Sequence, residues 1–285
     1  MEEAYFQYPN FAPMQLAKVS GILFESYLIP SEHLDRMVKI DLYFPKNIQD
    51  IKPIKLLLIN DGQDLPVFSF QSMLDSMQCQ KEIEPILCVG IHCGKERRME
   101  YGTISYVDYS GRGIKAAGHR NFVLHELIPF LKLKFSIKNF EEKAYAGFSL
   151  GGLTAIDVVW NHPDLFSKAG IFSGSLWWRL KALDKGYIED TDRIMHKQIR
   201  EGEFKPGLKF YFMTGSLDEK MDRNKNGVID SIDDTLGLID ELEKKGYNKP
   251  EDIAYINYED GRHDVPTWGK AMPDFLKWGW GVRKS

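Results

Sequence analysis

The sequence predicts an α/β fold with a mostly parallel central sheet and helices on both faces. Residues 55–59 and 86–91 are nearly continuous apolar runs, which are typical of parallel strands that helices cover on both sides. Later apolar runs alternate with helical stretches in the same way. The further predicted strands are 144–148, 168–172, 208–214 and 253–258, and the predicted helices include 121–134 and 233–245.

Two segments near the N-terminus predict antiparallel strands at one edge of the sheet. Residues 19–30 and 36–44 partly alternate apolar and polar side chains, as half-solvated strands do. No repeat, linker or low-complexity segment divides the chain, so residues 1–285 are expected to form one domain. Insertions between its elements are expected near 95–118 and 175–206.

The charge balance argues against two classes of partner. Lys and Arg number 37 and Asp and Glu number 41, which gives a net charge of −4. A chain with this balance has no overall basic field to attract nucleic acid or an anionic membrane. The sequence predicts neither kind of partner, and it carries no signal for an oligomeric state.

The cysteines and the N-terminus bear on the compartment. The three cysteines, Cys79, Cys88 and Cys93, are odd in number and have no C-x-x-C spacing, so they indicate no disulfide framework. The first residues lack a basic segment followed by an apolar core, and no run approaches the ~20 apolar residues needed to cross a bilayer. The chain as written is expected in the cytoplasm, or in the periplasm or outside the cell if a signal peptide has been removed.

A Gly-x-Ser-x-Gly pattern at residues 147–151 is the first indication of chemistry. It lies between the predicted strand 144–148 and a helical stretch at 152–160. In this strand–turn–helix setting the pattern forms a nucleophile elbow, whose glycines leave room for a serine held in a strained conformation above the sheet. Ser149 is therefore the candidate nucleophile, although the five residues alone also fit a plain turn.

A serine nucleophile needs a base to accept its proton, and with this pattern the histidine comes last in the chain. Three histidines follow Ser149. His162 ends the helix and His196 lies in a charged helical stretch, so both are expected on the surface. His263 follows the last predicted strand through a turn, at a position where parallel sheets place functional groups. It is the candidate base, although alone it also fits a solvent-facing loop residue.

The acid that orients the base is expected after the preceding strand, 208–214. Two carboxylates, Asp218 and Glu219, follow that strand closely. Asp218 is preferred because it matches the strand-end turn position that this fold uses, and Asp222 is a third candidate. A serine, an acid and a histidine in this order at successive strand ends are far less expected by chance than any one of them.

Acyl transfer also requires N–H donors for the oxyanion that develops in the transition state. One donor is expected from the residue after the serine, Leu150. The second is expected in the loop 60–64, immediately after an apolar strand, at Gln63 or Asp64. The Asp-Gly dipeptide in this loop also fits an ordinary turn.

Together these residues resemble the esterase D-like branch of the α/β-hydrolases, which includes enterochelin-type siderophore esterases and feruloyl or acetyl-xylan esterases. The similarity covers roughly residues 36–280. The motifs that carry it are residues 57–63, 98–102, 126–130, 146–152, 172–178 and 261–263. They are specific for the family and not for a substrate.

The resemblance implies an α/β-hydrolase fold in which Ser149 is the nucleophile, Asp218 the acid and His263 the base. This agrees with the reasoning from the residues themselves. It also implies that Trp177 and Trp178 lie near the substrate, although large aromatic side chains more often pack in cores.

The tryptophans and nearby arginines suggest a substrate class. Two adjacent tryptophans cannot both point the same way, so one of them is expected to face the cleft. Aryl groups and carbohydrates stack on such rings, and Arg97, Arg98 and Arg112 are candidates for contact with an anionic group. The expected substrate is a small-molecule or carbohydrate ester of a carbohydrate-linked, aryl or siderophore type.

Residues 222–233 resemble the calcium loop of EF-hands. Oxygen-bearing side chains stand at positions 1, 3 and 5, a glycine at position 6 and an acid at position 12. The candidate ligands are Asp222, Asn224, Asn226, Val228 and Asp233. The last ligand is Asp where EF-hands usually carry Glu, and no helix is expected before the loop. The residues also fit an Asn/Gly-rich turn, but a bound ion would stiffen the loop that carries Asp218.

The sequence thus predicts a serine esterase that works through a Ser-His-Asp triad and an acyl-enzyme. It predicts no organic cofactor, and the loop suggests a structural calcium ion. A catalytically inactive binding protein of the same fold is the alternative from another class, against which the complete set of triad candidates argues. An acyltransferase or peptidase would keep the triad, and assays of alcohol acceptors beside water separate transfer from hydrolysis.

Overall fold

Eight strands form one sheet in the computed structural model, which describes residues 21–51 and 53–282. Their order along the sheet is β1-β2-β4-β3-β5-β6-β7-β8. The bounds are β1 Ile22–Ser31, β2 Arg36–Pro45, β3 Lys55–Asn60, β4 Leu87–Ile91, β5 Glu142–Phe148, β6 Lys168–Phe172, β7 Lys209–Leu217 and β8 Ile253–Arg262. The first two residues of the predicted strand 19–30, and the N-terminal residues considered for a signal peptide, lie outside the described residues.

Strand direction follows the pattern of apolar residues. From β4 onward in the sheet, every neighbouring pair through β3, β5, β6, β7 and β8 is parallel. β2 is antiparallel to both of its neighbours, β1 and β4. The predicted mostly parallel sheet with antiparallel N-terminal strands is confirmed. Only β1 of the two is an outermost strand, because β2 is hydrogen-bonded on both sides.

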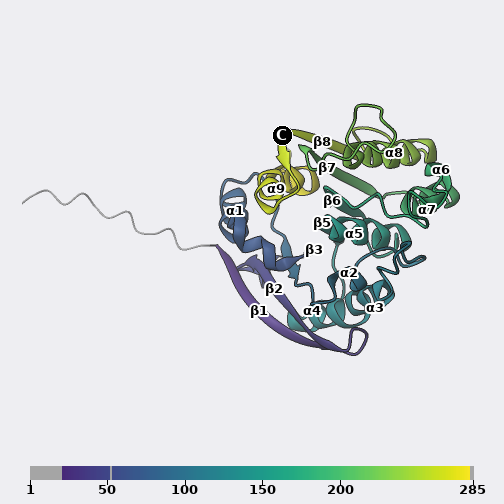
Figure 1. Cartoon of the computed structure of the whole chain (residues 1–285). Coiled ribbons are helices and arrows are strands. Elements are labelled where there is room, and N and C mark those ends of the chain that lie inside the picture. Colours follow the sequence, from purple (N-terminus) through teal and green to yellow (C-terminus); the bar gives the residue numbers. More distant parts are fainter. Residues whose placement is uncertain (1–20, 52, 283–285) are drawn as a thin grey trace, which may run out of the picture.

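Helices cover both faces of the sheet (Figure 1). Their bounds are α1 Phe70–Cys79, α2 Arg97–Glu100, α3 Ala116–Asn121, α4 Ile128–Lys134, α5 Leu150–Asn161, α6 Glu189–Asp192, α7 Ile194–Glu201, α8 Asp230–Lys245 and α9 Val265–Trp280, with 3₁₀ turns η1 Ile48–Asp50 and η2 Gly62–Phe68 and a π-helical turn η3 Phe122–Leu127. α1 and α9 lie on one face, and α4, α5, α7 and α8 lie on the other.

Each face of the sheet has its own apolar core. Successive residues of a strand point to opposite faces. In β3, Leu56 and Leu58 accordingly pack in the core under α4 and α5, whereas Leu57 and Ile59 pack in the core under α1 and α9. The continuous apolar run of this strand is therefore explained by burial on both sides.

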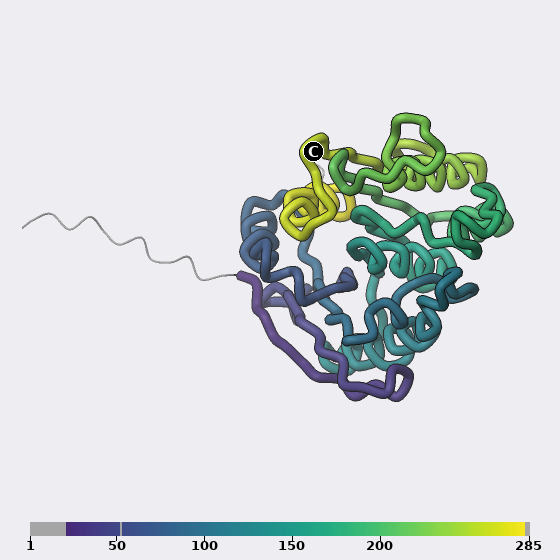
Figure 2. The backbone as a smooth tube through the Cα atoms, in the orientation of Figure 1, coloured from purple at the N-terminus to yellow at the C-terminus, as the bar shows by residue number. Residues whose placement is uncertain are grey.

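The parallel strands end at a common edge, so the residues that follow them gather there. Ser149 follows β5, Ser173 follows β6, Asp218 follows β7 and His263 follows β8. The chain between β7 and α8 projects from this part of the domain as an open loop (Figure 2).

The last strand differs from its prediction. A turn is expected after residue 258, whereas β8 continues to Arg262 and pairs with Leu217 across an irregularity in register. Two glycines allow this, because a Cβ on Gly215 would lie 2.5 Å from the carbonyl carbon of Gly261. Because the two backbones pass so closely, β7 and β8 stay paired up to Arg262, and His263 lies at the edge of the sheet.

Candidate active site

Ser149 lies in a tight turn between β5 and α5. Its backbone angles are φ +54° and ψ −119°, a combination that residues with a side chain rarely adopt. The Ser149 N–H donates to the Phe172 carbonyl at 2.9 Å, and the Gly152 N–H donates to the Ser149 carbonyl at 3.0 Å. A Cβ on Gly147 would lie 2.4 Å from the carbonyl carbon of Gly151. The glycines thus let strand and helix approach closely enough to hold the serine in this strained position.

A cavity of about 450 Å³ opens beside this turn and brings together most of the predicted site residues. Ser149, Asp218 and His263 all line it, although they come from three different strand ends. The other lining residues are Arg97, Arg98, Arg112, Leu150, Ser173, Gly174, Ser175, Trp177, Glu219 and Ser231. Gln63, Trp178 and the five predicted calcium ligands are not part of this lining.

The ring of His263 stands against the wall of the cavity. It packs edge-on against the Trp268 indole, with ring centroids 5.3 Å apart and an interplanar angle of 83°. Desolvation lowers the pKa of His263 and the charge of Arg97 adds to this, whereas the charge of Asp218 raises it. The net direction is downward, so the imidazole is neutral and able to accept a proton at neutral pH.

Not all of the hydrogen bonds expected between Ser149, His263 and Asp218 are formed. Among the described residues, neither ring nitrogen of His263 has a hydrogen-bond partner. The Ser149 hydroxyl instead lies 3.2 Å from the hydroxyl of Ser175, which the sequence did not single out. Catalytic hydrogen bonds often tighten only when substrate is bound.

Asp218 is half-buried at the end of β7. Its Oδ1 accepts a hydrogen bond from the Ser173 hydroxyl at 3.1 Å, and its Oδ2 accepts one from the Gly215 N–H at 3.1 Å. Burial raises the pKa of Asp218, while these donors and the charge of His263 oppose the rise. Glu219 also lines the cavity, and burial and the charges of neighbouring carboxylates raise its pKa. The electrostatic contact with His263 favours Asp218 over Glu219.

Leu150 and Gln63 occupy different positions relative to the cavity. Leu150 is the first residue of α5, where a backbone N–H has no acceptor inside the helix, and it lines the cavity. The side chain of Gln63 donates to Asp61 in its own loop at 3.2 Å and accepts from the N–H of Cys93, after β4, at 3.2 Å. Any contribution of Gln63 to an oxyanion hole would therefore come from its backbone.

Arg97 is tied to the protein and is not a free cation. Its guanidinium makes two hydrogen bonds of 2.7 Å to the carboxylate of Asp61 and one of 3.3 Å to the carbonyl of Phe148. It also lies over the ring of Tyr101, 5.1 Å from the centroid, and the Tyr101 hydroxyl accepts from the Asp61 N–H at 3.2 Å. Arg97 thus joins the loop after β3 to the turn that carries Ser149.

The other two candidate arginines, Arg112 and Arg98, differ in whether a carboxylate pairs with their charge. Arg112 is paired with the buried carboxylate of Asp108 and lies over Trp177, 4.7 Å from the centroid of its indole. Arg98 is exposed and has no ion-pair or hydrogen-bond partner for its side chain among the described residues. The positive charge available at the cavity is therefore mainly that of Arg98.

Two side chains lie deeper than expected. Trp178 is fully buried, with its ring beneath Gly102 and Gly113, so of the two tryptophans only Trp177 lines the cavity. His196 is predicted on the surface but is 1% exposed, and its Nε2 bonds the Asp234 carbonyl at 2.8 Å. The prediction for His196 is wrong because α7 presents this residue to α8, where burial drives its pKa well below the ordinary value.

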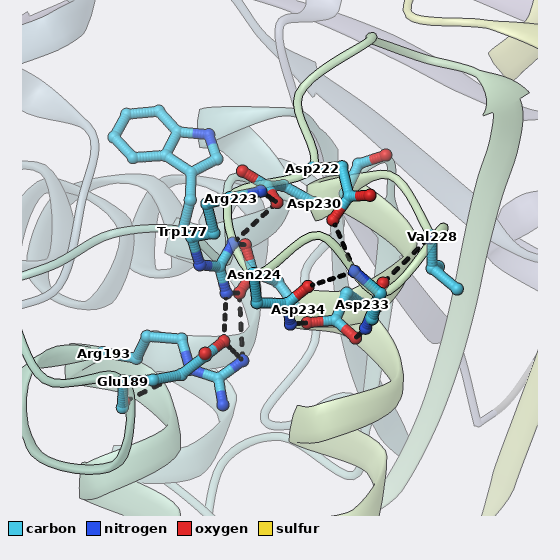
Figure 3. Close-up of polar contacts among 12 residues, drawn as sticks. Trp177, Glu189, Arg193, Asp222, Arg223, Asn224, Val228, Asp230, Asp233 and Asp234 are labelled. Carbon is cyan, nitrogen blue, oxygen red and sulfur yellow. Dashed lines mark hydrogen bonds and ion pairs between the residues drawn. The ribbon is translucent and has the colours of Figure 1, made fainter. Parts of the chain in front are cut away.

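The loop 222–233 folds around its first carboxylate (Figure 3). Asp222 accepts hydrogen bonds from the N–H groups of Asn226 at 3.1 Å and Gly227 at 2.9 Å. The side-chain amides of Asn224 and Asn226 donate to the carboxylate of Asp233 at 3.1 and 2.9 Å. The Val228 N–H donates to Asn226 Oδ1 at 2.8 Å, so all five candidate ligands are joined by hydrogen bonds within the loop.

This loop is anchored by its second residue. The Arg223 guanidinium pairs with Asp234 of α8 and with Glu189 of α6 (Figure 3).

The described residues contain no group of three or more His, Cys, Asp or Glu side chains arranged for a metal. The five candidate ligands would instead offer oxygen atoms from two carboxylates, two amides and a backbone carbonyl.

The chain belongs to the Putative esterase family, whose family model matches residues 31–278. Together with the sheet order and the cavity at the carboxyl edge of the sheet, this family defines an ester hydrolase of the α/β-hydrolase fold.

Relatives of similar length occur in Bacillus subtilis. The uncharacterized protein YbbA is 23% identical over 269 residues, which cover 90% of this chain and 97% of YbbA. The uncharacterized protein YjcH is 21% identical over 256 residues, which cover 87% of this chain and 93% of YjcH.

Solved structures share the fold. The enterochelin esterase of Shigella flexneri superposes with a TM-score of 0.70 at 19% identity and covers 94% of this chain, but this chain matches only 62% of that enzyme. A siderophore hydrolase, EstB of Aspergillus nidulans, gives 0.65 at 14% identity, with 96% of this chain and 100% of EstB covered. A ferulic acid esterase gives 0.66 at 15% identity, with 91% and 97% covered.

No helix within residues 21–51 and 53–282 is both long enough and apolar enough to cross a membrane.

Proposed function

We propose that the protein is a serine carboxylic-ester hydrolase in which Ser149 is the nucleophile, His263 the base and Asp218 the acid. The observation that carries the proposal is the convergence of these side chains, from the ends of β5, β7 and β8, on one cavity. The strained backbone of Ser149 supports it, because such strain is typical of a nucleophile at a strand-to-helix turn.

In the proposed reaction His263 takes the Ser149 proton as Oγ attacks the ester carbonyl carbon. The Leu150 N–H, together with the backbone N–H of Gln63, stabilises the oxyanion. The imidazolium then protonates the departing alcohol, which leaves an acyl-enzyme on Ser149. A water molecule, deprotonated by His263, hydrolyses this intermediate. Asp218 stays ionised and stabilises the imidazolium.

The proposed substrate is an ester with an aryl, carbohydrate or siderophore-type group. Trp177 offers an aromatic surface on the cavity wall, and Arg98 offers an uncompensated positive charge. The structural relatives include enzymes named for enterochelin and ferulic acid esters. An aryl ester that also carries negative charge is the substrate that both side chains would favour.

The first experiment is hydrolysis of p-nitrophenyl acetate by the wild type and by Ser149→Ala. The variant should lose activity to the level of the uncatalysed reaction while its circular dichroism spectrum stays unchanged. Ser175→Ala is the matched comparison, since it removes the hydroxyl that bonds Ser149 without removing the proposed nucleophile. Near-normal turnover by Ser149→Ala would refute the mechanism.

An inactive binding protein and an acyltransferase are the competing functions. One panel of ester substrates separates both of them from the esterase. The panel compares kcat/KM for nitrophenyl, acetylated-sugar, feruloylated-sugar and catecholate esters, each with and without an added alcohol acceptor. Hydrolysis at a rate that the alcohol does not change supports the esterase. Ester product in preference to acid supports a transferase, and no turnover of any ester supports a binding protein.

We also propose that the loop 222–233 binds calcium as a structural ion. The support is the EF-hand spacing of Asp222, Asn224, Asn226 and Asp233, and the positive φ of +86° at Gly227, the position where that motif has its glycine. The Val228 carbonyl would supply a further oxygen. The loop begins four residues after Asp218, so an ion there would restrain the segment that carries the proposed acid.

Calorimetric titration of calcium into chelator-treated protein tests this site. Binding should disappear in Asp222→Ala and persist in Asp240→Ala, an exposed carboxylate of α8 outside the loop. Saturating calcium should also raise the unfolding temperature of the wild type, because an ion that binds only the folded chain stabilises it. No binding heat and no thermal shift at millimolar calcium would remove the proposal.

A further inference from the structure

Ser173 connects the proposed acid to helix α9. It is the first residue after β6, it is 1% exposed, and its φ is +45°. Its Oγ lies 3.1 Å from Asp218 Oδ1 and 3.1 Å from Trp268 Nε1. The other atom within reach is the Met213 sulfur at 3.9 Å, which is a weak acceptor.

The chemistry of these groups fixes the direction of both hydrogen bonds. An indole N–H can only donate, so the Ser173 oxygen accepts from Trp268. An ionised carboxylate can only accept, so the one hydroxyl proton of Ser173 points to Asp218. The hydrogen bonds therefore run in one sense, from Trp268 through Ser173 to Asp218.

Trp268 is itself held in place by the elements of the site. Its indole stacks on Phe148, the residue before Ser149, with centroids 5.0 Å apart and an interplanar angle of 9°. It also meets the ring of His263 edge-on. A single indole thus contacts a neighbour of the nucleophile, the base, and the serine that bonds the acid.

The backbone at Ser173 has a conformation that suits glycine. A positive φ disfavours any side chain and suits glycine. Serine differs from glycine here by the hydroxymethyl group, and that group makes the two hydrogen bonds described above. The Ser173 N–H is also bound, donating to the Met213 carbonyl at 2.7 Å, so the residue is fixed at both ends.

We propose that Ser173, held by Trp268, is a positioning residue that fixes the plane of the Asp218 carboxylate toward His263. Oδ1 is held by Ser173 and Oδ2 by the Gly215 N–H, so rotation of the carboxylate breaks at least one hydrogen bond. The inference rests on the proposed function and adds to it the groups that orient the acid. Neither Ser173 nor Trp268 is required to touch the reacting atoms.

Ser173→Gly tests the role of the hydroxyl, because glycine tolerates the positive φ. With p-nitrophenyl acetate, kcat should fall about 10- to 100-fold, the effect of losing one hydrogen bond to a charged group, while KM changes less than about twofold. Ser136→Gly is the matched control, since Ser136 is exposed, has φ +52° and lies outside the cavity. This control should keep wild-type kcat, and an unchanged kcat in Ser173→Gly would overturn the inference.

The deciding measurement adds Ser173→Gly to Asp218→Asn. If Ser173 acts through Asp218, the second change should lower kcat by less than about twofold in this background. A further tenfold loss would show an independent structural role and overturn the inference. Asp218→Asn alone reports on the proposed function, because full activity there would remove Asp218 as the acid whatever Ser173 does.

Trp268→Phe tests the same inference by removing the hydrogen bond that Trp268 donates to Ser173. It keeps an aromatic ring against Phe148 and removes the N–H that orients Ser173. We expect a smaller loss of kcat than in Ser173→Gly, with KM again unchanged, and no further loss when Asp218→Asn is present. If Ser173→Gly does not fold, as judged by circular dichroism, this variant carries the comparison, and an equal loss with and without Asp218→Asn would overturn the inference.

Discussion

Replacement of Arg97 by methionine is predicted to destabilise the protein strongly. The guanidinium makes two hydrogen bonds of 2.7 Å to Asp61, whose side chain is 1% exposed. Arg97→Met leaves that carboxylate buried without its cation. Breaking a buried ion pair by removing one partner costs about 3–5 kcal/mol, because the remaining charge is uncompensated.

Urea unfolding of the wild type and the variant measures this cost as a difference in the free energy of unfolding. The control is Lys115→Met, which breaks an ion pair with Glu96. Their side chains are 43% and 56% exposed, so both charges stay hydrated and the loss of stability should be far smaller than that of Arg97→Met. Adding Asp61→Asn to Arg97→Met should recover part of the loss, since it removes the unpaired charge. A cost for Arg97→Met no larger than that of the control would refute the reasoning.

Three further predictions concern the cavity and the turn that carries Ser149. The pKa of His263 is lowered, so the base stays neutral to lower pH and the acid limb of kcat/KM should lie below pH 6.5; a limb above that value would contradict the direction. Arg98→Ala should raise KM roughly fivefold for a negatively charged aryl ester, equivalent to about 1 kcal/mol, and leave KM for the neutral ester unchanged; an equal rise for both esters would argue against a charge effect. Gly147→Ala should destabilise the protein by about 1–3 kcal/mol in urea unfolding, because its Cβ would lie 2.4 Å from the carbonyl carbon of Gly151, and wild-type stability would show that the turn can relax.

Much of the fold followed from the sequence because both faces of the sheet are covered. The apolar run of β3 had to be a buried strand, and the strand–glycine–serine–helix order around Ser149 left little choice of local structure. The positions of Asp218 and His263 followed from the same rule, since parallel strands end at one edge. Their meeting at one cavity was therefore predictable, whereas their individual hydrogen bonds were not.

The missed residues are those whose partners are distant in sequence. Ser173 bonds a tryptophan 95 residues away, and nothing in the local pattern around either residue indicates this contact. The pairing of Arg97 with Asp61 spans 36 residues, and it removed Arg97 from the candidates for binding an anionic substrate. A serine directly after a central strand, on the edge that carries the nucleophile, was the available signal for Ser173.

The prediction that His196 lies on the surface was wrong for a different reason. Its neighbours in the sequence are charged, which suggested a solvated helix, but a helix has two faces. In α7 the buried residues include Ile194, Met195 and Ile199, so the apolar face includes the histidine. The charges nearby mark the opposite face and carry no information about His196.

The central claim is that Ser149 is an activated nucleophile, and covalent labelling tests it most directly. The protein is incubated with a fluorophosphonate, its intact mass is measured, and the modified peptide is sequenced by mass spectrometry. The account predicts one adduct, on Ser149, that forms in the wild type and is absent from Ser149→Ala. An unlabelled wild type, or an adduct on another residue that persists in Ser149→Ala, would contradict it.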